Sequence, residues 1–253
     1  LMNRTIETGS LSGRSLIFAT LFAALIAGTK LPYLPAMVAI IVGLWCFARE
    51  QRPAWPALLA SLTVVVLVPL IWTSASNAGA VDASWSGRMI APSEQIAFLL
   101  QTPLAIFHIA QATFETFGWR YPHEMVGYLG WLDASISWNG AMLLLFLLVT
   151  VVLLDRPDRS VGRARWGIAT GLLLSLGGIF LSLYIAFNPV GSLTGIAGVQ
   201  GRYFLPLLAF FAFLFPSSAL RPWKLRSAML SVILLVLVSQ VELIQTVINR
   251  YYL

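Results

Sequence analysis

Seven apolar runs dominate the sequence and constrain its fold more than any other feature. They cover residues 15–28, 32–48, 54–73, 138–154, 166–187, 204–220 and 228–248. A helix that crosses a bilayer needs roughly 20 apolar residues. Only 10% of the chain is charged, whereas soluble proteins carry about 25%. The sequence therefore predicts an all-α, polytopic transmembrane helix bundle with about seven spans, forming a single integral membrane domain over residues 1–253.

The basic residues between the runs set the predicted orientation. One side of the membrane receives Arg4, Arg14, Arg49, Arg52, Arg156, Arg159, Arg163, Arg165, Arg221, Lys224 and Arg226. The other side receives Lys30, Arg88, Arg120, Arg202 and Arg250. Because cytoplasmic loops are enriched in Lys and Arg, we expect the N-terminus inside and the C-terminus outside. The net charge of +6 then reflects topology, and no nucleic-acid partner is expected.

Residues 74–137 form one long extracytoplasmic loop in this topology. A single crossing inside it would place the arginines of 156–165 outside, so the loop crosses zero times or twice. Within it, residues 95–114 have a polar face and an apolar face, which is typical of an interfacial amphipathic helix. We expect Pro103 to break that helix in two and residues 74–86 to be irregular. The polar face consists of Glu94, Gln101, His108, Gln111 and Glu115.

A membrane-edge arginine, Arg202, is the first candidate site. Gly198 and Gly201 flank it, which lets backbone amides approach a ligand, and a guanidinium binds phosphate through a bidentate fork. Together with Gln200 and Tyr203 it is a candidate for a phosphate or pyrophosphate headgroup. The alternative is a snorkelling arginine that anchors a helix end, with Tyr203 in the aromatic belt. Lys30, at the tip of the first helical hairpin, and Arg88 are further candidates for phosphate contact.

A second candidate surface lies between residues 118 and 133. Asp133 or Glu124 could act as a general base or orient a hydroxyl group, beside a sugar-binding surface. That surface would comprise Trp119, Arg120, His123 and Trp131. Alternatively, the aromatic residues form an interface belt, and Asp133 caps the next helix with Ala134 and Ser135 in its first turn.

Other polar residues give weaker signals. His108 and His123 lack the spacing of metal ligands, so no metal or cofactor is assigned, and a divalent-metal requirement stays open. Glu242 lies in the last apolar run, where it either pairs with an outward arginine or approaches the outer interface.

Four stretches resemble the bacterial polytopic membrane family catalogued as domain of unknown function 2142. They are Thr29–Pro35, Gly127–Asp133, Tyr184–Gly191 and Gly198–Pro206. The family is similar in layout to membrane glycosyltransferases of the GT-C type, which use a polyprenyl-phosphate sugar donor at the extracytoplasmic face. Such enzymes carry an acid in the first outward loop, but Gly28–Pro32 contains none. The resemblance therefore implies a C-terminal fragment whose principal catalytic acid lies upstream.

Three functions follow as hypotheses. The first is transfer of a sugar from a polyprenyl-phosphate donor to a cell-envelope glycan. Its expected partners are the polyprenyl-phosphate sugar and the lipid bilayer. The second is transport or flipping of a lipid-linked glycan, which needs a polar route through the bilayer. The runs at 54–73, 138–154 and 204–220 contain no acidic or basic residue that could line one. The third is a non-catalytic assembly partner that binds through the glycines of 166–187. The first is preferred.

Overall fold

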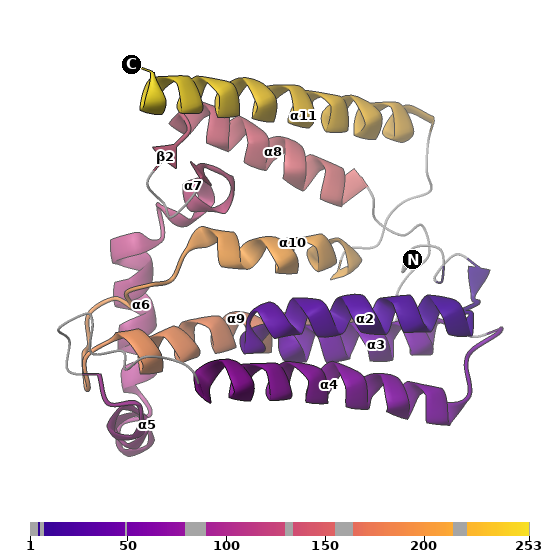
Figure 1. Ribbon diagram of the computed structural model, residues 1–253, viewed down its shortest axis with the longest axis horizontal. Coiled ribbons are helices and arrows are strands. Elements are labelled where there is room, and N and C mark those ends of the chain that lie inside the picture. Colours follow the sequence, from indigo (N-terminus) through magenta and orange to yellow (C-terminus); the bar gives the residue numbers. More distant parts are fainter. Residues whose placement is uncertain are drawn as a thin grey trace. The chain divides into compact units, whose positions relative to one another are not determined.

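The computed structural model describes residues 5, 8–48, 50–78, 90–129, 134–154, 164–214 and 222–252. They form helices and one short β-hairpin (Figure 1), which confirms the predicted all-α class. The chain divides into two compact units. The first comprises Leu1–Ile90, Arg156–Ser182 and Phe210–Ala219, and the second comprises Ala91–Asp155, Leu183–Ala209 and Leu220–Leu253.

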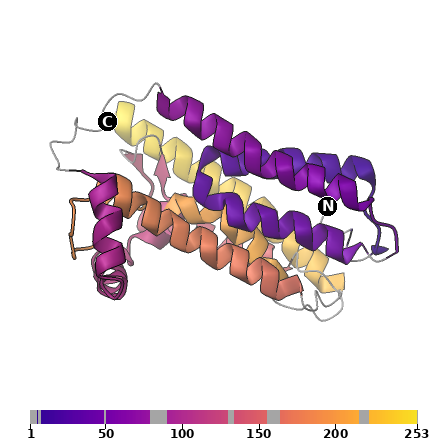
Figure 2. The same ribbon diagram turned by 90° about the horizontal axis from the view of Figure 1, so that it is seen from below.

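The first unit begins with the predicted helical hairpin. Helix α2 (Gly13–Thr29) ends at Lys30, whose extended backbone (φ −154°, ψ 120°) breaks the helix. The 3₁₀ turn η1 (Leu31–Tyr33) then leads into α3 (Leu34–Phe47). Pro32 and Pro35 occupy the first turns of η1 and α3, where the missing N–H costs little. The hairpin is therefore confirmed, with α4 alongside α2 and α3 (Figure 2).

Helix α9 (Ala164–Phe187) packs on α3 through small residues at intervals of three and four. A Cβ on Gly171 would lie 2.6 Å from the Cβ of Ala39, and one on Gly178 would lie 3.3 Å from Pro32. Between them, the buried hydroxyl of Ser175 accepts a hydrogen bond from the N–H of Ala36 (3.0 Å). That N–H lies in the first turn of α3 and has no partner within the helix. The small residues thus let α9 approach α3 closely, and the Ser175 hydroxyl provides a hydrogen-bond partner for the N–H of Ala36.

Helix α4 (Trp55–Ala78) is longer than the sequence suggested. The prediction that residues 74–86 are irregular is wrong for 74–78, which continue the helix, and 79–86 lie outside the described residues. The reason is local: this stretch contains neither glycine nor proline before Gly79, so nothing in it interrupts the backbone hydrogen bonds of the helix.

The second unit begins with the segment expected to be amphipathic. Helices α5 (Pro92–Gln101) and α6 (Ala105–Phe117) meet at a bend of 113°, which confirms the break at Pro103. The polar face is exposed as far as it is described, and several large apolar side chains are exposed as well. These are Ile96, Leu100, Ile106, Phe107 and Phe114.

A short helix, α7 (Tyr121–Val126), and a hairpin of β1 (Tyr128–Leu129) and β2 (Ala134–Ser135) follow. Helix α8 then covers Trp138–Leu154, as predicted. The idea that Ala134 and Ser135 form its first turn is wrong, because they pair with β1. Ser137 caps the helix instead, with its hydroxyl accepting the N–H of Gly140 at 3.0 Å.

The last apolar run is a single helix, α11 (Pro222–Tyr251), which lies beside α8 (Figure 1). Ile136, Ala141 and Leu144 form a buried cluster against which Leu235 and Val238 of α11 pack. The run predicted at 204–220 is instead a broken helix, composed of η3 (Gly201–Phe204), α10 (Leu205–Phe211) and η4 (Ala212–Leu214). Residues 215–221 lie outside the described ranges.

Three helices of the described residues are long and apolar enough to cross a membrane: Trp55–Ser76, Arg165–Phe187 and Arg226–Tyr251. The bent pair α5–α6 would be a fourth if it formed one span. The other predicted spans correspond to shorter apolar helices, Gly13–Thr29, Leu31–Phe47, Trp138–Leu154 and Gly201–Leu214.

Candidate functional site

The segment from residue 188 to 200, which leads into η3, is held by buried amide and hydroxyl groups. The Asn188 side chain donates to Leu183 O (3.0 Å) and accepts from Ala197 N (2.9 Å). Gln95 Oε1 accepts from Gly191 N (2.9 Å), and Thr113 Oγ1 accepts from Ile196 N (3.0 Å). All three side chains are buried. These hydrogen bonds connect the segment that precedes Gly201 to α5, α6 and α9.

Gly201 packs directly on helix α7. A Cβ at this position would collide with the carbonyl oxygen of Tyr121 and would lie 2.8 Å from the N–H nitrogen of Met125. The close contact lets the backbone N–H of Gly201 donate to Oε2 of Glu124 at 3.1 Å. Glycine is required here by the space available.

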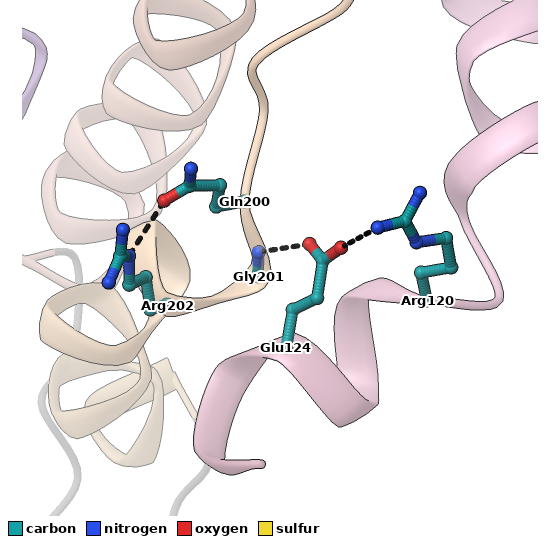
Figure 3. A network of polar contacts seen from close by, with 5 residues as sticks. All are labelled: Arg120, Glu124, Gln200, Gly201 and Arg202. Carbon is teal, nitrogen blue, oxygen red and sulfur yellow. Dashed lines mark hydrogen bonds and ion pairs between the residues drawn. The ribbon is translucent and has the colours of Figure 1, made fainter. Parts of the chain in front are cut away.

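Glu124 is at the centre of a polar network (Figure 3). Its carboxylate is buried, with 5% of the residue exposed. Oε1 lies 3.1 Å from a terminal nitrogen of Arg120, one helical turn earlier, while Oε2 accepts from Gly201. A buried carboxylate is tolerated only when it is paired and hydrogen-bonded. The network therefore joins α7 to η3 through one charged side chain.

Arg202 lies on the other side of Gly201 from Glu124 (Figure 3). Its Nε donates to the side-chain oxygen of Gln200 at 2.7 Å. Gln200 and Tyr203 are only partly buried, as is Arg202 itself. Gln200 therefore contributes to the orientation of the guanidinium.

Tyr121 packs beneath this network. Its ring meets Phe204 edge to face, with centroids 5.5 Å apart, and only 5% of the residue is exposed. Burial raises the pKa of Tyr121 to about 12, and the negative charge of Glu124 adds to the shift. The phenol thus stays protonated across the physiological range and acts as a packing group.

His123 lies in an aromatic box on the same short helix. Its ring stacks on Trp138, with centroids 5.0 Å apart and planes 15° apart, and meets Tyr128 edge to face. Nε2 is 3.3 Å from the carbonyl oxygen of Ile136. His123 is buried, whereas Trp119 is 65% exposed. The ring centroids of Trp119 and Trp138 lie 6.3 Å apart. Of the predicted sugar surface, Trp119 is therefore exposed, and His123 is buried between aromatic rings.

The structure brings together five of the predicted site residues: Arg120, Glu124, Gln200, Arg202 and Tyr203. Lys30 belongs to the other compact unit. Arg88, Trp131 and Asp133 lie outside the described residues. Within the described ranges, no group of three or more His, Cys, Asp or Glu side chains could hold a metal ion.

Sequence reasoning missed helix α7 and the hydrogen bond from Gly201 to Glu124. The signal for α7 was present as Pro122 with Glu124 two residues later, since proline and acidic residues favour the first turn of a helix. The long-range contact had no local signal, because 77 residues separate Glu124 from Gly201.

A protein-family model matches most of the chain. The family described as "Predicted membrane protein (DUF2142)" matches residues 2–211, which include α7, η3 and the whole polar network. No curated protein and no solved structure matches the chain.

Proposed function

Because the chain belongs to the DUF2142 family of predicted membrane proteins, we propose that it acts in the bilayer on a lipid-linked substrate. The reaction proposed is transfer of a sugar from a polyprenyl-phosphate donor to a cell-envelope glycan at the extracytoplasmic face of the bacterial inner membrane. The observation that carries the proposal is the position of Arg202. Its guanidinium donates a hydrogen bond to Gln200, and the adjacent Gly201 packs tightly on α7.

Arg202 is assigned the role of binding the donor phosphate. A guanidinium that is held in place before binding forms two parallel hydrogen bonds with phosphate at a reduced entropic cost. In the transfer step the departing phosphate gains negative charge, and a fixed cation stabilises that charge. Tyr203 is its neighbour in η3, and Lys30 and Arg88 remain separate sequence-based candidates for phosphate contact.

Glu124 has a different proposed role from Arg202. Both oxygens of its carboxylate already have partners, Arg120 and the N–H of Gly201. A general base needs a lone pair within reach of the acceptor hydroxyl, so these contacts favour Glu124 as a positioning residue that holds η3. Asp133 then remains the proposed base of this chain.

The proposed topology has seven spans, with the N-terminus inside and the C-terminus outside. What supports it is that each predicted run contains an apolar helix. Two of the shorter ones, α2 and α8, have 17 residues, which is near the lower end of the length that spans a bilayer. In this topology α5 and α6 lie at the outer interface.

The test is made on the full-length gene in its host. We would replace Arg202 with Ala, and separately Asp133 with Asn, and use Arg14→Ala as the control because Arg14 is an exposed arginine at the start of α2. Membrane levels are checked first, and surface glycans are then profiled by mass spectrometry. The proposal expects loss of one sugar linkage in both variants and an unchanged profile in the control. Unchanged glycans in Arg202→Ala and Asp133→Asn at normal protein levels would contradict it.

A further inference from the structure

A polar cleft of about 600 Å³ lies in the second unit, between the start of α8 and the last turns of α11. Its lining includes Ser135 and Ser137 on one side and Glu242, Gln245 and Asn249 on the other, with the ring of Trp138 at its edge. Neither the sequence interpretation nor the family match assigns it a role, and its α11 side lies beyond the matched residues.

The face of α11 that borders this cleft changes character along the helix. Leu235 and Val238 pack on the apolar core against α8. From Glu242 onward the same face is polar, with Gln245, Thr246 and Asn249 at positions i+3, i+4 and i+7. Residues at these spacings share one face of a helix. The polar stripe begins where α8 begins, and so it faces the cleft.

Glu242 is built into this position. Its Oε2 accepts from Ser137 N (3.2 Å), and its Oε1 accepts from Ser137 Oγ (2.9 Å). A Cβ at Gly140 would collide with Oε1. The carboxylate thus caps α8, and Gly140 provides the necessary space. Capping accounts for Glu242, but it does not account for the amides of Gln245 and Asn249, which are exposed in the last turns of the helix and line the cleft.

The chemistry of the lining indicates the class of ligand. Amides and hydroxyls both donate and accept hydrogen bonds, which suits a ligand rich in hydroxyl groups. One carboxylate, Glu242, and one cation, Arg250, leave the lining without net charge, and the carboxylate would repel phosphate. Trp138 as a residue is 46% exposed, and the part of its ring that His123 does not cover offers an apolar surface for the carbon face of a sugar. A few placed polar groups beside an apolar wall are typical of small-molecule sites.

We propose that this cleft binds a neutral sugar residue, with Gln245 and Asn249 as its main hydrogen-bonding groups. The sugar is either the end of a free glycan or the headgroup of a lipid-linked one, and the shared chemistry is the ring hydroxyls. This inference goes beyond the transfer reaction, because the cleft shares no residue with the group around Arg202.

The experiment uses the full-length protein in lipid nanodiscs and saturation-transfer NMR. The probes are neutral methyl hexosides and pentosides, with inorganic phosphate as the anionic comparison. The test variant is Gln245→Ala with Asn249→Ala. The control is Gln240→Ala, an exposed glutamine on the same helix that does not line the cleft. Both variants change exposed side chains, and their helicity is verified by circular dichroism.

We expect saturable binding of at least one glycoside by the wild type, about a tenfold loss of affinity in the double variant, and unchanged affinity in Gln240→Ala. Absence of saturable glycoside binding by the wild type, equal binding by the double variant, or binding of phosphate alone would each overturn the proposal.

A second arm identifies the source of the sugar. A soluble trisaccharide and a polyprenyl-phosphate monosaccharide placed in the nanodisc compete separately with the bound glycoside. Displacement by the first assigns a free glycan, and displacement by the second alone assigns a lipid headgroup; displacement by neither overturns the proposal. The two proposals can fail separately. If the wild type binds glycosides but the Arg202→Ala variant leaves surface glycans unchanged, the sugar-binding cleft is supported and the transfer reaction is contradicted.

Discussion

At the scale of single residues, contacts decide what a charged group can do. Glu124 and Arg202 were both candidates for chemistry on the basis of residue type alone. The structure gives Glu124 an ion pair with Arg120 and a hydrogen bond from Gly201, while Arg202 is oriented by Gln200. The carboxylate therefore has the contacts of a structural link, whereas the role of the guanidinium as a phosphate ligand is a proposal that the Arg202→Ala variant tests.

Replacing Glu124 with Ala is expected to destabilise the second unit by about 1–3 kcal/mol, because it leaves the buried N–H of Gly201 without its acceptor. Glu124→Gln keeps a side-chain oxygen for that N–H and should cost less. Unfolding in mixed detergent micelles measures both, with Glu115→Ala as the control because Glu115 is exposed on α6.

The Glu124 variants also separate a positioning role from a catalytic one. A positioning residue predicts that Glu124→Gln retains most of the transfer that the wild type supports. Complete loss of transfer in Glu124→Gln at wild-type stability would instead show that Glu124 acts as the base.

At the scale of elements, the sequence located the long apolar helices well because their signal is local. The run at 138–154 coincides with α8, and the break at Pro103 was visible as a proline within an amphipathic pattern. The β1–β2 hairpin and the cap of α8 were missed. Strands of two residues each are too short to carry an alternating pattern. The Ser137 cap is local, but Glu242, which holds Ser137, reaches it from 105 residues away and has no local signal.

Two glycines of α9 should respond differently to the same substitution. A Cβ on Gly171 would lie 2.9 Å from the carbonyl oxygen of Pro35 and closer still to Ala39. Gly177 has nothing within 4 Å of the same position. We expect Gly171→Ala to lower stability by about 1–3 kcal/mol through overpacking, and Gly177→Ala to leave it unchanged or slightly higher because alanine favours helix.

Thermal unfolding of the two variants in one detergent measures this difference. Equal midpoints would contradict the packing of α9 on α3. If Gly177→Ala alone reduced co-purification with another membrane protein, the open glycine face would instead belong to an assembly partner, which was the third hypothesis from the sequence.

At the scale of the whole molecule, the sequence predicts seven spans and their orientation, which is more than the lengths of the described helices establish. Three helices reach the length of a span, and four apolar helices are shorter. The orientation depends on where Lys and Arg occur relative to these helices. For the site, sequence reasoning found the residue types of the network but not their pairing, because the pairing depends on how η3 packs on α7.

The orientation can be tested with single cysteines, because Cys46 is the only cysteine of the chain and can be replaced by Ser. Thr194→Cys lies in the segment between α9 and η3, and Gln51→Cys lies between α3 and α4; both positions are exposed. With the N-terminus inside, a membrane-impermeant maleimide should label Thr194→Cys in intact cells and should label Gln51→Cys only after permeabilisation. The reverse pattern would invert the topology and place Arg202 on the cytoplasmic side. A polyprenyl-phosphate donor at the extracytoplasmic face could not then reach it, so the topology and the proposed reaction depend on the same labelling result.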